Sequence, residues 1–194
     1  MARADEYSLL LLAGGKSSRM GSPKPELLWQ GKTFLMHMLD KAQNLGIQNC
    51  YISGYTASRP DVRTVWDIYP DRGPLGGLQA CMDAMDTPYC LVLPVDAPTL
   101  SLRVLEELLA AHESAPDRSR VLIWEHGDRQ EPLIAVYPAA MAETIAELIR
   151  DHAAPVFRAL DRWGYDRLRL ELPEDTPVNI NTPELYEILL GKNP

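Results

Sequence analysis

The sequence predicts an α/β fold, a three-layer sandwich whose mostly parallel sheet carries a short antiparallel hairpin. Short apolar runs of strand length alternate along the chain with segments of helical periodicity, which is the order expected when helices cover both faces of a parallel sheet. The runs at 7–13 and 89–95 are almost continuously apolar, which is typical of strands buried on both faces. Residues 120–138 form two strand-like runs around a turn at 126–128, and this pattern predicts the hairpin.

The other elements follow from periodicity and from residues that start or stop helices. Further strands are predicted at 49–54, 63–67 and 167–172. Helices are predicted where apolar residues recur at helical spacing, at 33–46, 75–86, 101–114, 140–152, 155–163 and 183–191. The expected N-caps are Thr33, Ser101 and Thr182, with Gly46 ending the first helix and Pro183 in the first turn of the last.

Length and charge narrow the class of protein. The 194 residues contain no internal repeat or low-complexity linker, so we expect a single domain over residues 1–194. The formal net charge of −8 disfavours nucleic acid and anionic membrane surfaces as partners. No apolar run reaches the roughly 18–20 residues that span a bilayer, and the first apolar stretch is too short for a signal peptide. We therefore expect a cytoplasmic protein.

Neither the cysteines nor the histidines indicate a redox or metal site. Cys50, Cys81 and Cys90 lie far apart in apolar stretches, which predicts small buried thiols. The four histidines form no pair at the i, i+4 spacing of a helical metal site.

The end of the first strand predicts a phosphate-binding loop. Gly14 and Gly15 follow the strand directly, and Lys16, Arg19 and Lys24 come after them without an intervening acid. Glycines allow close approach of the backbone to a ligand, and cations with free amides suit a polyphosphate. A solvated basic turn is the structural alternative.

Spacing excludes the two common nucleotide-binding loops. A P-loop ending at Lys16 and Ser17 requires glycine at position 10, where the chain has Leu10 in the middle of a strand. The dinucleotide fingerprint fails as well, because the glycines fall at 14, 15 and 21.

Two later strand ends carry aspartates. Asp67 is the last residue of the predicted strand at 63–67 and precedes Gly73, Gly76 and Gly77, which open a helix where a base or ribose could lie against the backbone. Asp96 ends a buried strand, and one carboxylate facing a triphosphate is sufficient to hold Mg²⁺. A Gly/Pro turn and a structural cap are the respective alternatives.

Near the C-terminus, Asn179 and Asn181 alternate around Ile180. Both amides of an extended segment then face the same side, where they could bind a polar heterocycle or a phosphate. Loop capping is the structural alternative.

Taken together, five segments resemble the molybdopterin nucleotidyltransferase family, in the family's order and over nearly the whole chain. They are "LAGGKSSRMG" with the following Lys24, then "GPLGGL", "LPVDAP", "EPLIAVY" and "NINTPEL". The resemblance implies a Rossmann-like fold and Mg²⁺-dependent transfer of GMP from GTP to the phosphate of molybdopterin or Mo-molybdopterin, with release of pyrophosphate. Proteins of cofactor delivery and molybdoenzyme maturation are the macromolecular partners that it implies.

The resemblance also implies roles for individual residues. The catalytic set is Arg19, Lys24 and Asp96, and Asp96 is the metal ligand. Asn179 and Asn181 line the acceptor side. The nucleotide-binding set is Leu12, Ala13, Gly14, Gly15, Lys24, Asp67, Gly76 and Asp96.

Three other functions stay open at this point. The two-residue step from Gly21 to Lys24 also occurs in cytidylyl relatives, so CTP is an alternative to GTP, and the acceptor could be another phosphorylated metabolite. A catalytically idle nucleotide-binding subunit for cofactor delivery is the alternative from another class. A sugar glycosyltransferase is disfavoured because the chain contains no Asp-x-Asp.

Overall fold

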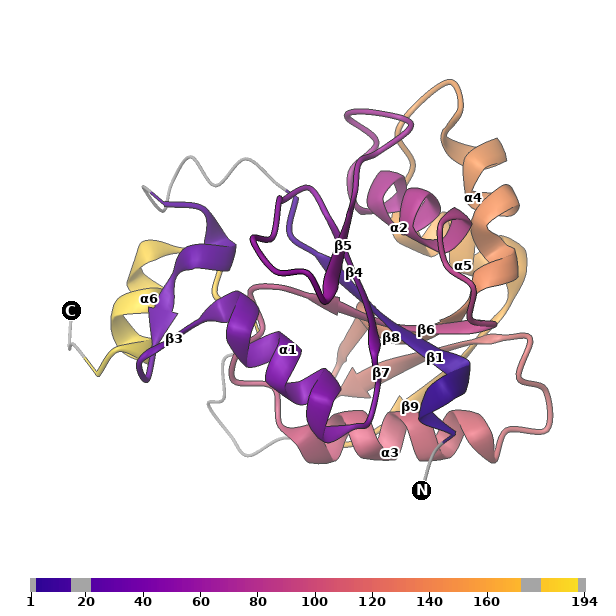
Figure 1. Cartoon of the computed structure of the whole chain (residues 1–194). Coiled ribbons are helices and arrows are strands. Elements are labelled where there is room, and N and C mark those ends of the chain that lie inside the picture. The colour runs from indigo at the N-terminus through magenta and orange to yellow at the C-terminus, as the bar shows by residue number, and fades with distance from the viewer. Residues whose placement is uncertain (1–2, 15–21, 172–178, 192–194) are drawn as a thin grey trace.

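The computed structural model describes residues 3–14, 22–171 and 179–191 of the chain, and its described strands form one large sheet with a small second one (Figure 1). In the described residues the large sheet has seven strands in the order β5-β4-β1-β6-β8-β7-β9. Its strands are β1 (Tyr7–Leu12), β4 (Asn49–Ser53), β5 (Val62–Val65), β6 (Tyr89–Pro94), β7 (Val121–His126), β8 (Arg129–Pro138) and β9 (Tyr165–Arg169). The small sheet pairs β2 (Leu28–Trp29) with β3 (Lys32–Thr33).

Helices connect most of the strands. The α-helices are α1 (Phe34–Asn44), α2 (Pro74–Asp83), α3 (Leu102–Glu113), α4 (Ala142–Ile149), α5 (Val156–Trp163) and α6 (Pro183–Leu189). Short 3-10 helices lie at η1 (Ala4–Glu6), η2 (Lys24–Glu26) and η3 (Ala139–Met141). None of the helices in the described ranges is both long and apolar enough to cross a membrane.

The sheet confirms the predicted fold class. The predicted hairpin lies inside the sheet, whereas the sequence suggested an addition to it. Strands β5, β4, β1 and β6 pair in parallel, and β7 pairs in parallel with β9. The antiparallel β8 lies between β6 and β7, so the hairpin is part of the sheet and not a flap on its edge. Strand β8 is buried from Ile134 to Pro138, which an interior position requires.

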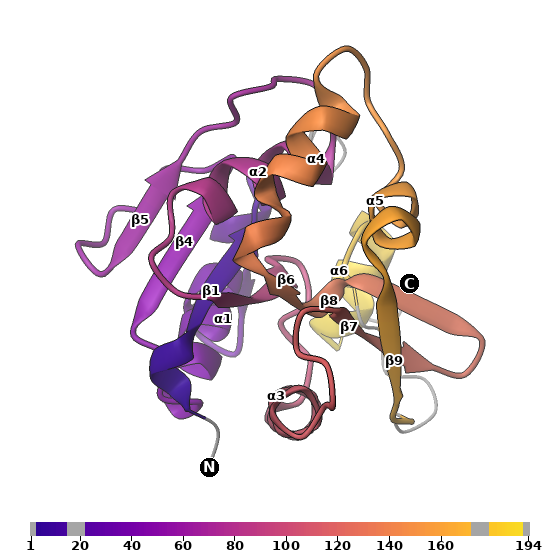
Figure 2. The same ribbon diagram turned by 90° about the vertical axis from the view of Figure 1, so that its right-hand side faces the viewer.

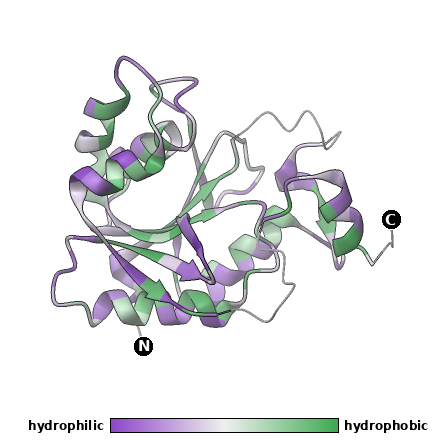
Figure 3. Ribbon diagram, turned by 180° about the vertical axis from the view of Figure 1, so that it is seen from behind, coloured by the Kyte–Doolittle hydropathy of each residue, from purple (hydrophilic) through white to green (hydrophobic). Residues whose placement is uncertain are grey.

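Helices cover both faces of this sheet (Figure 2). Alternate residues of each strand contribute to two separate cores, because successive side chains point to opposite faces. In β1, Leu9 and Leu11 pack with α1 and α3, whereas Leu10 packs with α2, α4 and α5. In Figure 3 the strands of the sheet are largely hydrophobic, whereas the helices that cover them carry both hydrophobic and hydrophilic residues.

The three predicted N-caps are confirmed. The side-chain oxygens of Thr33, Ser101 and Thr182 accept hydrogen bonds from backbone amides at the start of α1, α3 and α6, at 3.1, 3.4 and 3.3 Å. These bonds satisfy amides that have no partner inside the helix.

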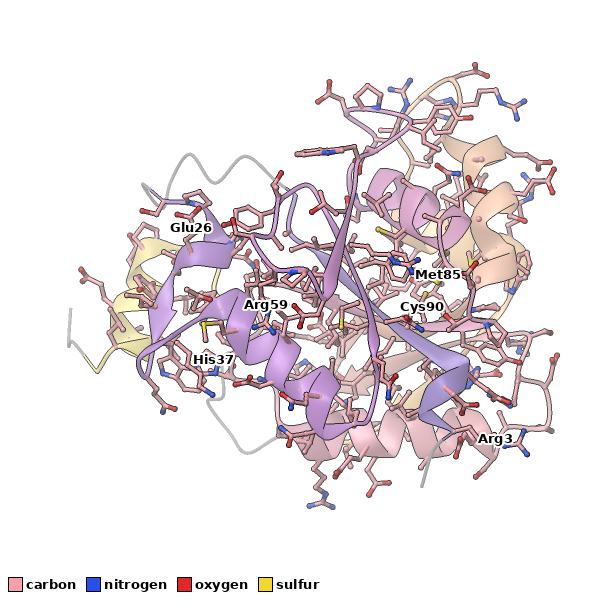
Figure 4. All side chains as sticks on the ribbon, viewed as in Figure 1. Arg3, Glu26, His37, Arg59, Met85 and Cys90 are labelled. Atoms are coloured by element: carbon pink, nitrogen blue, oxygen red, sulfur yellow. The ribbon has the colours of Figure 1, made fainter. Side chains whose placement is uncertain are left out.

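The cysteines are buried and unpaired by disulfides in the described residues, as predicted. Burial raises the pKa of Cys50 to about 11 and that of Cys81 to about 12. Cys90 lies within the sheet (Figure 4), where burial also raises its pKa. These thiols are therefore structural.

A small third core joins the segment that leads into α1 to the C-terminal segment with α6. Leu27 and Phe34 pack against Ile180, and the partly buried face of α6 covers them. His37 projects from α1 toward the β2–β3 pair (Figure 4), where its Nε2 lies 2.8 Å from the carbonyl of Trp29. This core fixes Ile180, so the two asparagines that flank it are held beside the main sheet.

Candidate active site

A cavity of about 640 Å³ lies at the edge of the sheet where the parallel strands end. Its wall runs from the residues after β5 and α2's first turn, across the ends of β4, β1 and β6, to the first half of β8. Ligand sites of open α/β sheets form beyond the carboxyl ends of the strands, so the cavity lies at the strand ends where the sequence predicts ligand-binding residues.

An ion pair stands at the centre of the cavity. Lys24 Nζ lies 2.5 Å from Asp96 Oδ2 and 2.6 Å from Asn181 Oδ1. The side chains of Lys24 and Asp96 are 23% and 11% exposed. The structure thus joins three residues that were predicted separately, and it places an ammonium group between two oxygen ligands.

The local chain holds Lys24 in position. Pro23 and Pro25 flank it, and Pro25 is buried in η2. Proline fixes its own φ and restricts the preceding residue, so this segment enters the cavity with little freedom. The Glu26 carboxylate accepts a hydrogen bond of 3.1 Å from Tyr55, which ties the segment to the loop after β4.

Backbone hydrogen bonds position Asp96. The amide of Val95 donates to Leu12 O at 3.0 Å, which extends the β1–β6 pairing beyond the last paired residues. The amide of Ile180 donates to Asp96 O at 2.8 Å. On the other side, Lys41 Nζ donates to Pro98 O at 2.8 Å, and burial lowers the pKa of Lys41 to about 8. The loop that carries Asp96 is therefore held from β1, from the C-terminal segment and from α1.

A second carboxylate is oriented at the other end of the wall. Ser53 Oγ, at the end of β4, donates to Asp67 Oδ1 at 2.7 Å. Within the described chain, Asp67 Oδ2 accepts no hydrogen bond. One oxygen of Asp67 is thus fixed by the protein, and the other remains able to accept from a ligand.

Glycines of α2 make room for this pair. A Cβ at Gly76 would lie 2.9 Å from Asp67 Oδ2, and one at Gly77 would lie 2.5 Å from Ser53 Oγ. Real Cβ atoms do not approach so closely, and any larger residue would displace the serine or the aspartate. The "GPLGGL" segment therefore supports the position of the Asp67 carboxylate.

The ends of β1 and β4 also approach closely. Gly54 has a φ of 79°, and a Cβ there would lie 2.4 Å from the Cα of Gly14. The amide of Ala13 donates to Ser53 O at 3.0 Å. Glycine at position 54 thus permits both the turn and the close contact with the backbone of Gly14.

The end of the cavity formed by β8 and the C-terminal segment contains polar groups without strong partners. Asn179 Oδ1 is buried and has no hydrogen-bond partner in the described ranges. Glu131, in β8, has a side chain that is 17% exposed and lies 3.4 Å from His126 Nε2. Buried polar groups normally have partners, so both residues favour a ligand that supplies hydrogen-bond donors.

Most of the predicted site residues gather at this cavity. Those that line it are Leu12, Ala13, Gly14, Lys24, Asp67, Asp96, Asn179 and Asn181. Gly76 is not among the lining residues and instead lies against Asp67. Gly15 and Arg19 lie outside the described residues, so their roles stay predictions.

Three polar lining residues, Ser53, Asp71 and Glu131, have no role predicted from the sequence. A serine at a strand end has the signature of an ordinary turn, and only its distance to Asp67 distinguishes it. Glu131 was visible as part of the "EPLIAVY" segment, but nothing in that segment shows which side chains face the cavity.

The donor set fits a hard divalent cation. Asp96 and Asn181 supply a carboxylate and an amide oxygen. The positively charged Lys24 ammonium lies between these two oxygens. The described residues contain no group of three or more His, Cys, Asp or Glu side chains that could hold a metal. Mg²⁺ commonly uses one or two carboxylates together with substrate phosphates, so such a group is not required.

Comparison with known proteins identifies the family of the chain. The description "MobA-like NTP transferase domain" belongs to a family profile that matches residues 9–168. The molybdenum cofactor guanylyltransferase of Xanthomonas euvesicatoria pv. vesicatoria is 35% identical over 189 residues, which are 95% of each chain. That of Pseudomonas aeruginosa is 33% identical over 183 residues, which are 92% of this chain and 91% of the relative.

Solved structures share the fold. Molybdopterin-guanine dinucleotide biosynthesis protein A from Archaeoglobus fulgidus aligns with a TM-score of 0.74 and 23% identity, covering 94% of this chain and 96% of the other. A 2-C-methyl-D-erythritol 4-phosphate cytidylyltransferase from Thermus thermophilus aligns with a TM-score of 0.67 and 17% identity, covering 94% and 96%. The profile match and the sequence relatives decide the family: the chain belongs to the MobA-like NTP transferases and is a nucleotidyltransferase.

Proposed function

We propose that this nucleotidyltransferase transfers GMP from GTP to the phosphate of molybdopterin or Mo-molybdopterin. Its relatives are named molybdenum cofactor guanylyltransferase, which supports a role in molybdenum cofactor biosynthesis. In the reaction, an oxygen of the acceptor phosphate forms a bond to the α-phosphorus of GTP. The bond from that phosphorus to the bridging oxygen breaks, and pyrophosphate leaves with the electron pair.

The chemistry demands positioning and charge neutralisation more than proton transfer. The acceptor phosphate is already anionic at neutral pH, so no strong base is needed. Negative charge grows on the α-phosphoryl group and on the leaving pyrophosphate, where fixed cations stabilise it. Lys24 and Arg19 would supply this charge from the protein.

The residues divide the cavity into three parts. Asp67, oriented by Ser53, would accept from the N1–H and 2-amino groups of guanine, beside the backbone of residues 12–15. Lys24 would bind the phosphates at the centre, and Asn179 and Asn181 would bind the acceptor.

Mg²⁺ would be held by Asp96 and would neutralise phosphate charge when bound. The Lys24 ammonium occupies the place beside Asp96 in this structure. When a triphosphate binds, Lys24 would exchange the carboxylate for phosphate oxygens while its positive charge stays in the site.

The observation that carries the proposal is the Lys24–Asp96–Asn181 cluster at the middle of the wall. A cation, a carboxylate and an amide at one point are suited to a phosphate bridge between two larger groups. Retention of this cluster also disfavours an idle binding subunit, which would not need it.

A nucleotide panel tests the proposal. Purified protein is incubated with Mg²⁺, molybdopterin with or without molybdate, and GTP, CTP or ATP in separate reactions, and pyrophosphate is measured. We expect release that requires both GTP and the pterin. Pyrophosphate release with CTP alone would overturn the assignment of guanine as the base. Release with none of the nucleotides would favour the idle subunit or another acceptor. Cofactor-delivery proteins as partners and a cytoplasmic location stay predictions.

A further inference from the structure

Glu131 is a carboxylate of the cavity wall that the proposed transfer does not yet use. It lies in β8, on the far side of the Lys24–Asp96 pair from Asp67. Strands β6 and β8 are antiparallel, with Val92 opposite Ala135. Continuing this register toward the end of β6 brings the segment before Leu133 beside the loop that carries Asp96.

The sheet order separates the two outer carboxylates. Asp67 follows β5 and Glu131 belongs to β8, which are four strand positions apart in the order β5-β4-β1-β6-β8. At about 4.8 Å per strand, β5 and β8 lie roughly 19 Å apart, and the bond from Ser53 holds the Asp67 carboxylate at the end of β4. The Lys24–Asp96 pair lies between them, at the end of β6. The cavity therefore has a carboxylate toward each end, on either side of the proposed phosphate-binding centre.

The Glu131 side chain is held but incompletely satisfied. Its Oε1 lies 3.4 Å from His126 Nε2, a long contact, and His126 stacks on the buried Trp124 with ring centroids 4.4 Å apart. No other side-chain hydrogen bond to Glu131 occurs among the residues that the structure describes. A carboxylate with only 17% of its side chain exposed is costly to keep charged without donors. A ligand that offers two donors would satisfy it.

The acceptor of the proposed reaction has such an edge. The pyrimidine ring of a pterin presents N3–H and a 2-amino group side by side, the same pair of donors that guanine presents at N1 and its 2-amino group. One carboxylate accepts both bonds through its two oxygens. We propose that Glu131 binds the N3–H and 2-amino edge of the acceptor pterin and so determines acceptor specificity.

This inference rests on the proposed function. It assigns the two ends of the cavity to two chemically similar heterocycles, the guanine ring toward Asp67 and the pterin ring toward Glu131. Asn179, whose buried Oδ1 has no partner in the described chain, lies on the same wall and would add to binding of the acceptor.

Glu131→Gln tests the assignment by a change of ligand preference. A carboxamide offers one acceptor and one donor, which match the N3–H and C2 carbonyl of a 2,4-dioxopteridine better than the two donors of a pterin. Binding of 6-hydroxymethylpterin and of 6-hydroxymethyllumazine is measured by their fluorescence, with the full chain. We expect the native protein to favour the pterin by roughly 5- to 150-fold, the range for about 1–3 kcal/mol per bidentate pair. The variant should reverse that preference.

Glu125→Gln is the matched control. Glu125 lies in the same hairpin, where Gln130 and Arg167 contact its Oε2, and it is not among the cavity-lining residues. This control should keep the native preference. Glu131→Asp retains a carboxylate and should still favour the pterin, with weaker binding, which gives a second test if the glutamine variant folds poorly.

The outcomes separate this inference from the proposed function. If Glu131→Gln still prefers the pterin, or loses both pteridines equally while its KM for GTP is unchanged, the role of Glu131 is overturned and the proposed function stands. If the native protein binds GTP but neither pteridine, the pterin acceptor itself is overturned, and the role of Glu131 with it.

Discussion

Replacement of Lys24 by methionine tests the dual role assigned to this side chain. In the structure the lysine contacts Asp96 and Asn181 at 2.5 and 2.6 Å, and in the reaction it would move to the phosphates. Methionine retains the length of the chain but not the charge. We expect two effects of opposite sign, a slower reaction and tighter binding of a divalent cation in the absence of nucleotide.

The size of each effect follows from the geometry. Loss of one preorganised electrostatic donor costs about 2.7–4 kcal/mol in the transition state, which lowers kcat roughly 10²- to 10³-fold. A hydrogen bond to a charged group contributes about 1.5–3 kcal/mol. The pair is partly exposed, with side chains 23% and 11% accessible, so solvent screening reduces this value. We expect Asp96 to bind Mn²⁺ about 5- to 30-fold more tightly once the ammonium is gone, or about 1–2 kcal/mol.

Two assays measure these effects. Pyrophosphate release with saturating GTP and molybdopterin gives kcat, and paramagnetic resonance of free Mn²⁺ gives the affinity without nucleotide. Lys32→Met is the matched control, because Lys32 forms a 2.5 Å ion pair with Asp40 whose side chains are 49% and 39% exposed. That variant should change neither quantity. Native kcat in Lys24→Met, or weaker Mn²⁺ binding, would refute the reasoning.

Three further predictions concern other parts of the wall and its support. Asp96→Asn should reduce Mg²⁺-dependent transfer by at least about 100-fold with an unchanged circular dichroism spectrum, and near-native turnover would contradict the metal assignment. Asp67→Asn should shift the ratio of kcat/KM for GTP to that for XTP by about 10-fold or more in favour of XTP. The reason is that Ser53 still donates to the amide oxygen, and the amide nitrogen then faces the base. An unchanged preference for GTP would argue against base recognition by Asp67. Burial lowers the pKa of Lys41 from 10.5 to about 8. Between these pH values the unfolded chain therefore binds more protons than the native protein, and the free energy of unfolding increases as the pH rises. Denaturant unfolding at pH 7, 9 and 10 should show this gain relative to Lys41→Met, and parallel pH profiles would exclude it.

Much of the fold was predictable because local patterns determine it. The buried β1 and β6 are continuous apolar runs, and the N-caps Thr33 and Ser101 follow from short-range hydrogen bonds. The position of β8 inside the sheet was not predictable in the same way. A hairpin has the same turn and strand pattern whether it lies at an edge or between two strands, and only pairing with β6, 40 or so residues earlier, decides the matter.

The candidate site shows the same division. Residues at strand ends could be grouped from sequence because the carboxyl ends of parallel strands meet at one edge. The direct contact of Lys24 with Asp96 could not, since it joins loops 72 residues apart. The Ser53–Asp67 bond depends on space that Gly77 leaves on a neighbouring helix, which no local pattern of the two polar residues reveals.

The most direct test of the central claim follows the phosphorus atoms of the nucleotide. The protein is incubated with Mg²⁺, molybdopterin and GTP that carries a label at either the α- or the γ-phosphate, and products are separated by mass. We predict that the α-label appears in a molybdopterin–guanine dinucleotide and the γ-label in pyrophosphate, in equal amounts. Release of the γ-label as inorganic phosphate, or no transfer of the α-label to the pterin, would contradict the claim.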